Sequence, residues 1–100
     1  MFYAIIGEDV ADSLSRRMAV RAAHLKRIEA LVQAGRLLLA GSFPAIDSPE
    51  PGPAGMSGSL IVAEFDSLEA ARAWIEADPY VTEGVFAAVV VKPFCRIFPE

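Results

Sequence analysis

The sequence predicts an α+β domain of the ferredoxin-like type, with a four-stranded antiparallel sheet and two helices on one of its faces. Three observations support this class. The 100 residues suffice for a single domain over residues 1–100. Turn residues divide the chain into six segments whose hydrophobic spacing follows the order β-α-β-β-α-β. The hydrophobic fraction of 54% is high, so apolar side chains have to fill a core or an interface.

The first strand and the first helix form the first third of the chain. Aromatic and branched residues predict a strand over residues 2–7, which ends at a glycine. A helix is expected from the cap residue, Asp12 or Ser13, to Ala34. Gly35 is placed to end it in a left-handed conformation. Its apolar stripe consists of residues spaced three and four apart, namely Leu25, Ile28, Leu31 and Val32.

Two further strands and a long loop follow. Strands are expected over residues 37–43 and 59–65, where apolar side chains dominate. Between them, residues 44–58 contain four prolines and three glycines, which favour a loop. Loops of this length in small domains are often functional. If the protein is an enzyme, we expect this segment to shield the pocket, and a contact with the partner subunit is the alternative.

The last part of the chain contains the second helix and the fourth strand. Residues 66–69 are similar to a capping box and start a helix that runs to about Ala77. Pro79 ends this helix, because the residue before a proline avoids the helical region. A further helical turn is expected over residues 81–84, and the last strand over residues 85–98.

Neither face of the predicted sheet has a polar pattern. A sheet with one side in water alternates apolar and polar residues, but residues 2–6 and 85–91 are apolar at successive positions. The two helices can bury only one face. We therefore expect the second face to pack against the same face of another copy, in a closed homodimer.

The charge distribution argues against nucleic acid as a partner. The net charge is −4 and the pI is about 4.9, whereas a general nucleic-acid binder needs a basic patch. One basic cluster is present, and at helical spacing it spreads around the helix, so we interpret it as a solvated flank. Its members are Arg16, Arg17, Arg21, Lys26 and Arg27.

Cysteine and histidine usage limits the chemistry. Cys95 is the only cysteine, which excludes an intramolecular disulfide and favours a passive strand residue. One histidine without paired cysteines predicts no metal site, and the absence of a glycine-rich phosphate loop predicts no cofactor. The start of the chain does not resemble a signal peptide, and no apolar run has the length of a membrane span. These features favour the cytoplasm and exclude a membrane partner.

His24, the single histidine, is the first candidate for proton transfer. It lies four residues before Ile28 and seven before Leu31, which places it at the border of the apolar stripe. An imidazole titrates near neutral pH, so a partly buried one suits acid–base chemistry. The alternative is a core histidine with satisfied hydrogen bonds.

Asp78 is the second candidate. It lies at the predicted end of the second helix, where the helix dipole disfavours a carboxylate, so local stability does not explain it. The alternative is a turn residue, since Asp before Pro is common in turns. The two helices lie side by side in this fold, which allows Asp78 to contact His24. A carboxylate on one ring nitrogen would fix the tautomer and make the other nitrogen a general base or acid.

Other polar residues are candidates for binding a small-molecule substrate. Ser42 and Ser59 lie near strand ends beside glycines, which permit close backbone approach. Tyr80 follows the Asp-Pro step, and Arg21 lies one helical turn before His24. Arg21 could hold an anionic group, although a solvated arginine is the alternative. A Ser-His-Asp triad with Ser59 is disfavoured, because the sequence lacks the elbow motif of activated serines.

Several segments, in this order, resemble the YciI-like family and together cover nearly the whole chain. They are residues 2–5 (FYAI), 21–25 (RAAHL), 35–38 (GRLL), 40–41 (AG), 58–59 (GS), 65–71 (FDSLEAA), 77–80 (ADPY) and 91–94 (VKPF). The resemblance implies a dimeric ferredoxin-like α+β barrel, similar in architecture to muconolactone isomerases. It also implies an active site of a helix histidine and an aspartate before proline, which here are His24 and Asp78. Some relatives are linked to dehydrochlorination in the breakdown of aromatic compounds.

Three functions remain open from the sequence. The first is a small cofactor-independent enzyme that performs an elimination, an isomerisation or a hydrolysis through His24 and Asp78. The second is a module that binds a metabolite in the same pocket without chemistry. The third is an accessory dimer in which the two side chains only tie the helices together. A fold alone does not select among them.

Overall fold

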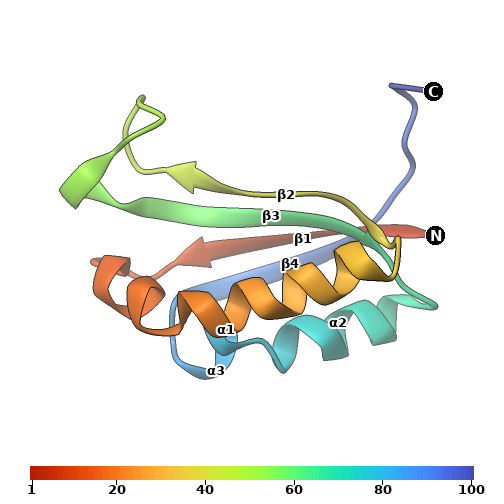
Figure 1. The fold of residues 1–100 in the computed structure, drawn as a ribbon, viewed down its shortest axis with the longest axis horizontal. Coiled ribbons are helices and arrows are strands. Elements are labelled where there is room, and N and C mark those ends of the chain that lie inside the picture. Colours follow the sequence, from red (N-terminus) through yellow and green to blue (C-terminus); the bar gives the residue numbers. More distant parts are fainter.

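The computed structural model describes all 100 residues and confirms the ferredoxin-like class. The strands are β1 (Phe2–Asp9), β2 (Leu37–Pro44), β3 (Met56–Glu64) and β4 (Phe86–Phe94). The helices are α1 (Leu14–Gln33), α2 (Leu68–Glu76) and the short α3 (Pro79–Thr82), with one 3-10 turn at Gly52–Ala54. All neighbouring strands are antiparallel, in the order β2-β3-β1-β4. The helices cover one face of this sheet (Figure 1).

The boundaries of the outer strands differ from the prediction. β1 continues two residues past Gly7, because Glu8 still pairs with Gly58 and with Ala88 on its two sides. β4 ends at Phe94 instead of residue 98, and the remaining residues leave the sheet as an exposed tail. Strand propensity alone therefore predicted the ends of these two strands poorly.

The apolar stripe predicted for α1 is partly wrong. Ile28 and Leu31 are buried as expected, but the side chains of Leu25 and Val32 are 41% and 47% exposed. Leu25 and Val32 each follow a buried residue, and one residue turns a helix by about 100°. The buried face is instead completed by polar residues nearer the N-terminus of α1, namely Arg17 and His24.

The helix ends follow their local chemistry. Gly35 has φ of +69° and ends α1, as predicted. Ser67 caps α2, accepting a hydrogen bond from the backbone N–H of Ala70. Ser13 occupies the N-cap of α1 but makes no capping bond, and its hydroxyl donates to Asp9.

The core lies between the sheet and the helices. Its centre is formed by Ile5, Ile61, Ile75 and Val85, each at most 2% exposed. Gly7 matters for this packing, since a Cβ there would lie 2.6 Å from the ring of Phe86. The Phe86 ring in turn meets Tyr80 edge to face, with centroids 5.6 Å apart. The core thus extends to the residues around His24.

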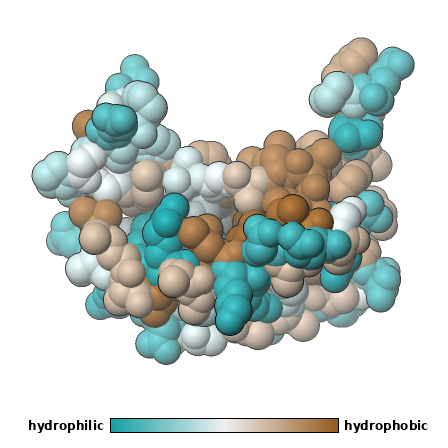
Figure 2. Space-filling model, viewed as in Figure 1, coloured by the Kyte–Doolittle hydropathy of each residue, from teal (hydrophilic) through white to brown (hydrophobic).

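The opposite face of the sheet is open and apolar. Ile6 pairs with Leu60 and with Val90, and side chains in register point to the same side of a sheet. Figure 1 shows the loop after β2 and the tail after β4 rising on this side. In Figure 2, apolar residues gather over the strands between these two projections. Separately, no helix is both long enough and apolar enough to cross a membrane.

Candidate active site

His24 and Asp78 are in direct contact. The Nδ1 atom of His24 lies 2.7 Å from Oδ2 of Asp78, across 54 residues of sequence. The imidazole is 8% exposed and the carboxylate is fully buried. α1 presents His24 on its buried face, and the break between α2 and α3 brings Asp78 beneath it.

The position predicted for Asp78 is corrected by the structure. It does not cap the C-terminus of α2, which ends at Glu76 with Ala77 as its cap. Asp78 is instead the N-cap of α3, where its carboxylate accepts a hydrogen bond from the Tyr80 N–H at 3.0 Å. A carboxylate is favoured at a helix N-terminus, so local stability does contribute to this choice.

Arg27 is a further partner of Asp78 that the sequence interpretation missed. Its Nη1 atom lies 2.8 Å from Oδ1 of Asp78. Burial alone would raise the pKa of Asp78, but hydrogen bonds from His24, the Tyr80 N–H and Arg27 lower it below its ordinary value. Asp78 is therefore ionised at neutral pH.

The ionised carboxylate determines the tautomer of His24. A carboxylate only accepts hydrogen bonds, so the Nδ1 atom of a neutral imidazole carries the proton. Nε2 then has a free lone pair, and no protein group bonds to it. Since His24 lines a cavity, this lone pair is the basic atom that a ligand can reach.

The ring of Tyr80 packs against one face of the His24 imidazole. The two rings stack with centroids 3.8 Å apart and planes within 5°. The guanidinium of Arg17 lies 5.0 Å from the Tyr80 ring centroid, on an aromatic surface that favours cations. Burial raises the pKa of Tyr80, although Arg17 and Arg21 oppose this, so its hydroxyl stays protonated at neutral pH.

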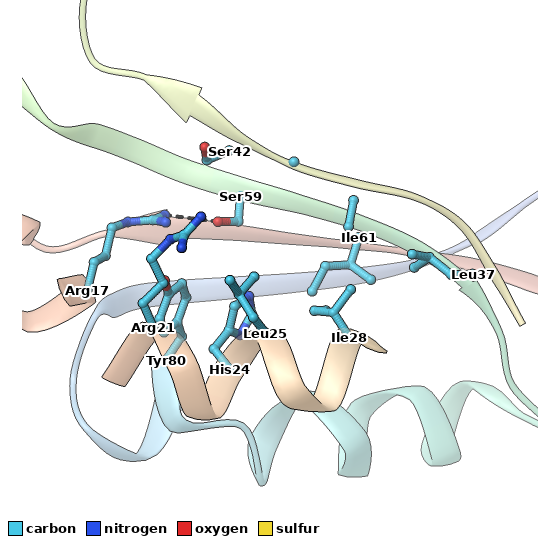
Figure 3. Close-up of a pocket in the computed structure, with 12 residues that line it drawn as sticks. Arg17, Arg21, His24, Leu25, Ile28, Leu37, Ser42, Ser59, Ile61 and Tyr80 are labelled. Carbon is cyan, nitrogen blue, oxygen red and sulfur yellow. Dashed lines mark hydrogen bonds between the residues drawn. The ribbon is translucent and has the colours of Figure 1, made fainter. Parts of the chain in front are cut away.

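The cavity beside His24 has a volume of about 330 Å³ and lies between α1 and the β2–β3 hairpin. In Figure 3, Arg21, His24 and Ile28 extend from α1 toward Ser59 and Ile61 on β3, and Ser42 lies above them on β2. The structure therefore brings five of the six predicted site residues to one cavity: Arg21, His24, Ser42, Ser59 and Tyr80. Asp78 lies behind the imidazole.

Two expectations about the surroundings of this cavity are wrong. Residues 45–57 do not line it, because the loop leaves the sheet on the side away from the helices. The basic cluster is not uniformly a solvated flank either. Arg17 is only 6% exposed, and the side chain of Arg27 is 27% exposed. Arg16, Arg21 and Lys26 are exposed, as expected.

Arg17 and Asp9 form a second buried ion pair that the sequence interpretation missed. Nε and Nη2 of Arg17 lie 2.6 and 2.8 Å from the two carboxylate oxygens of Asp9. Nη2 also donates to Oγ of Ser59 at 2.9 Å. A signal was present in the sequence, because Arg17 lies seven residues before His24 and eleven before Ile28 on the same helix face.

The side chains that line this cavity include groups suited to acid–base chemistry. No group of three or more His, Cys, Asp or Glu residues lies close enough to hold a metal ion. The arrangement offers one base, hydroxyl groups from serine and tyrosine, a guanidinium and an apolar wall. Such a site can move a proton on a small molecule.

Comparisons with known proteins match nearly the whole chain. The YCII-related domain family matches residues 1–95. Protein YciI of Escherichia coli O6:H1 is 56% identical over 98 residues, which cover 98% of this chain and 100% of that protein. A protein of Haemophilus influenzae is 47% identical with the same coverage.

One solved structure has a closely similar fold. It is the 5-chloro-2-hydroxyhydroquinone dehydrochlorinase of Burkholderia phenoliruptrix AC1100, in complex with 2,5-dihydroxybenzoquinone. It is 27% identical, covers 95% of this chain and 94% of its own, and has a TM-score of 0.83. Family match, identity and fold lead to the same result: the chain belongs to the YCII-related domain family.

Proposed function

We propose that the protein is a small cofactor-independent enzyme in which His24 transfers a proton to or from a small organic substrate. One observation carries the proposal. Nδ1 of His24 is bound to the buried carboxylate of Asp78, His24 lines the cavity, and no protein group bonds to its Nε2 atom. A histidine with only a structural role would have both nitrogens bonded or solvated at the surface.

The proposed reaction begins with proton abstraction. Nε2 of His24 takes a proton from a C–H or O–H bond, and the electron pair stays on the substrate. The resulting imidazolium lies against the Asp78 carboxylate, which stabilises its charge. In an elimination, the electron pair forms a double bond and expels a leaving group such as chloride. In an isomerisation, His24 returns the proton to another atom.

The other cavity residues are proposed to bind the substrate. Ser42, Ser59 and Tyr80 provide hydroxyl groups, and Arg21 provides a guanidinium without a carboxylate partner. Tyr80 has a second role, because its stacked ring limits rotation of the imidazole. The dehydrochlorinase with the similar fold supports an elimination as the first reaction to test.

The proposed functional unit is a homodimer in the cytoplasm. The open sheet face carries apolar residues on three adjacent strands, including Ile6, Leu60 and Val90. Burying this face against a second copy would remove apolar surface from water. Sedimentation equilibrium is then expected to give twice the chain mass of 10.7 kDa.

Chloride release from 5-chloro-2-hydroxyhydroquinone tests the elimination. We expect His24→Gln to lower the rate about a hundredfold, the usual contribution of a general base. Lys26→Gln is a matched control, because Lys26 is an exposed cation on α1 that does not line the cavity. An equal rate in His24→Gln and the native chain would contradict a role for the imidazole. No release by the native chain would exclude this substrate.

The tautomer of His24 tests whether Nε2 can act as the base, and this test needs no substrate. Because the chain has one histidine, its two ring nitrogens give one pair of 15N signals. In the neutral imidazole we expect a protonated Nδ1 and an unprotonated Nε2. The opposite tautomer would place the proton on the cavity side and exclude Nε2 as the base.

A further inference from the structure

The Asp9–Arg17 pair is a buried ionic contact that the proposed proton transfer does not use. Asp9 binds two nitrogens of Arg17, and the carboxylate is 1% exposed. The hydroxyl of Ser13 also donates to this carboxylate. Arg17 thus has a fixed direction, and its second Nη2 contact, to Ser59, is fixed with it.

The hydrogen bond from Arg17 makes the Ser59 hydroxyl a donor toward the cavity. The oxygen of Ser59 accepts the hydrogen bond from Arg17 at 2.9 Å. A hydroxyl that accepts a bond still has its own proton to donate, and no protein acceptor takes the one on Ser59. Ser59 is 5% exposed and lines the cavity. Its proton is therefore available to a ligand there.

The ionised groups around the cavity leave one positive charge unpaired. Asp9 pairs with Arg17, and Asp78 pairs with Arg27. Arg21 lines the cavity without an ion pair or a side-chain hydrogen bond. In Figure 3 its guanidinium extends toward Ser59 and the Arg17–Ser59 hydrogen bond. This local excess contrasts with the net charge of −4 of the whole chain.

The cavity also has an apolar wall, and it is small. Leu25 and Ile28 of α1 face Leu37 of β2 and Ile61 of β3 across it. A volume of about 330 Å³ is at the lower end for ligand pockets. Such a space fits a compact body, such as a single ring, more readily than a nucleotide or a peptide.

We propose that this cavity selects a small monoanion with an apolar body. Its anionic oxygen accepts hydrogen bonds from Arg21 and from the Ser59 hydroxyl, and the Asp9–Arg17 pair positions that hydroxyl. The inference rests on the proposed function, because it names the ligand class of the same cavity. Arg17 lines the cavity as well, but the role proposed for it is the same as for Asp9, namely to position Ser59.

Benzoate and benzamide test the charge preference, because they share size and shape and differ in charge. NMR titration of the full chain measures the affinity for each. We expect benzoate to bind about five times more tightly, the effect of one partly exposed ion pair. Arg21→Gln should remove this difference, whereas Lys26→Gln should retain it. Equal affinities, an unchanged ratio in Arg21→Gln, or no benzoate binding would overturn the proposal.

A double-mutant cycle tests the positioning role. Ser59→Ala should lower benzoate affinity about tenfold, since it removes a hydrogen bond to a charged group. Arg17→Lys keeps the charge but cannot hold Asp9 with two nitrogens and still reach Ser59. It should weaken benzoate binding in the native background and have no further effect in Ser59→Ala. Equal losses in both backgrounds would show that Arg17 does not act through Ser59.

Asp9→Asn is the second variant if Arg17→Lys does not fold, and the same comparison applies to it.

Failure of this inference is distinguishable from failure of the proposed enzyme. Binding of benzoate requires no proton transfer, so a lost charge preference leaves the effect of His24→Gln on turnover untouched. If benzoate is still preferred over benzamide but His24→Gln does not change turnover, the proposed enzyme mechanism is wrong and the proposed ligand class stands.

Discussion

Two buried ionic clusters lie along α1, and they differ in what they leave open. Near its start, Asp9 is bound by Arg17 through both carboxylate oxygens. In its middle, Asp78 is shared between His24 and Arg27. The groups of the first cluster bond mainly to one another, whereas the second leaves Nε2 of His24 facing a cavity.

The difference separates two uses of a buried carboxylate. A guanidinium has five donors and stays charged, so its pair with a carboxylate fixes geometry. An imidazole has two nitrogens, and a carboxylate on one prepares the other for proton transfer. We therefore expect changes at Asp9 to alter positions and stability, and changes at Asp78 to alter the chemistry as well.

The largest effect is expected from Asp78→Asn. Three donors from His24, Arg27 and the Tyr80 backbone meet this one carboxylate, and the change leaves the charge of Arg27 uncompensated. We expect the free energy of unfolding to fall by about 3 kcal/mol, as for a broken buried ion pair. Urea denaturation measures this loss, and the 15N signals of His24 should lose the single tautomer. An unchanged tautomer would show that the charge of Asp78 does not determine it.

Asp9→Asn is expected to have a narrower effect, which is confined to stability and position. It weakens the two bonds to Arg17, and we expect the free energy of unfolding to fall by about 3 kcal/mol, as for a broken buried ion pair. The 15N signals of His24 should stay as they are in the native chain, because Asp9 does not contact the imidazole. Changes in these signals as large as those in Asp78→Asn would remove the distinction between the two clusters.

The smallest effect is expected from acid. The pKa of Asp78 is lowered in the folded chain relative to its ordinary value of 3.8. The unfolded chain therefore binds the proton first as the pH falls, and stability is lost from about pH 4 downward through the folded pKa. Urea denaturation between pH 3 and 6 should show this decline, which Asp78→Asn lacks. Parallel curves for both chains would mean that other carboxylates cause the acid sensitivity.

The prediction of individual site residues shows where sequence reasoning ends. Hydrophobic spacing placed His24 on the border of the buried face of α1, because a helix repeats on a regular period. The same rule placed Leu25 there, although it is 41% exposed. Asp78 looked unfavourable because the sequence suggested that α2 ends there, whereas α2 ends at Glu76 and Asp78 caps a new helix that begins at Pro79. Spacing gives the face of a helix, but its rotation against the sheet comes from packing.

The sequence by itself determined the element order, the helix ends at Gly35 and Ser67, and the two apolar faces of the sheet, since these depend on neighbouring residues. Only the tertiary structure decided that Arg17 pairs with Asp9, that Arg27 joins His24 on Asp78, and that the loop after β2 turns away from the cavity. The physical reason is that these contacts join different elements and depend on how the elements pack. Arg27 and Asp78 are 51 residues apart, while Arg17 and Asp9 are 8 residues apart but lie on α1 and β1. Local propensities do not specify which buried charges meet.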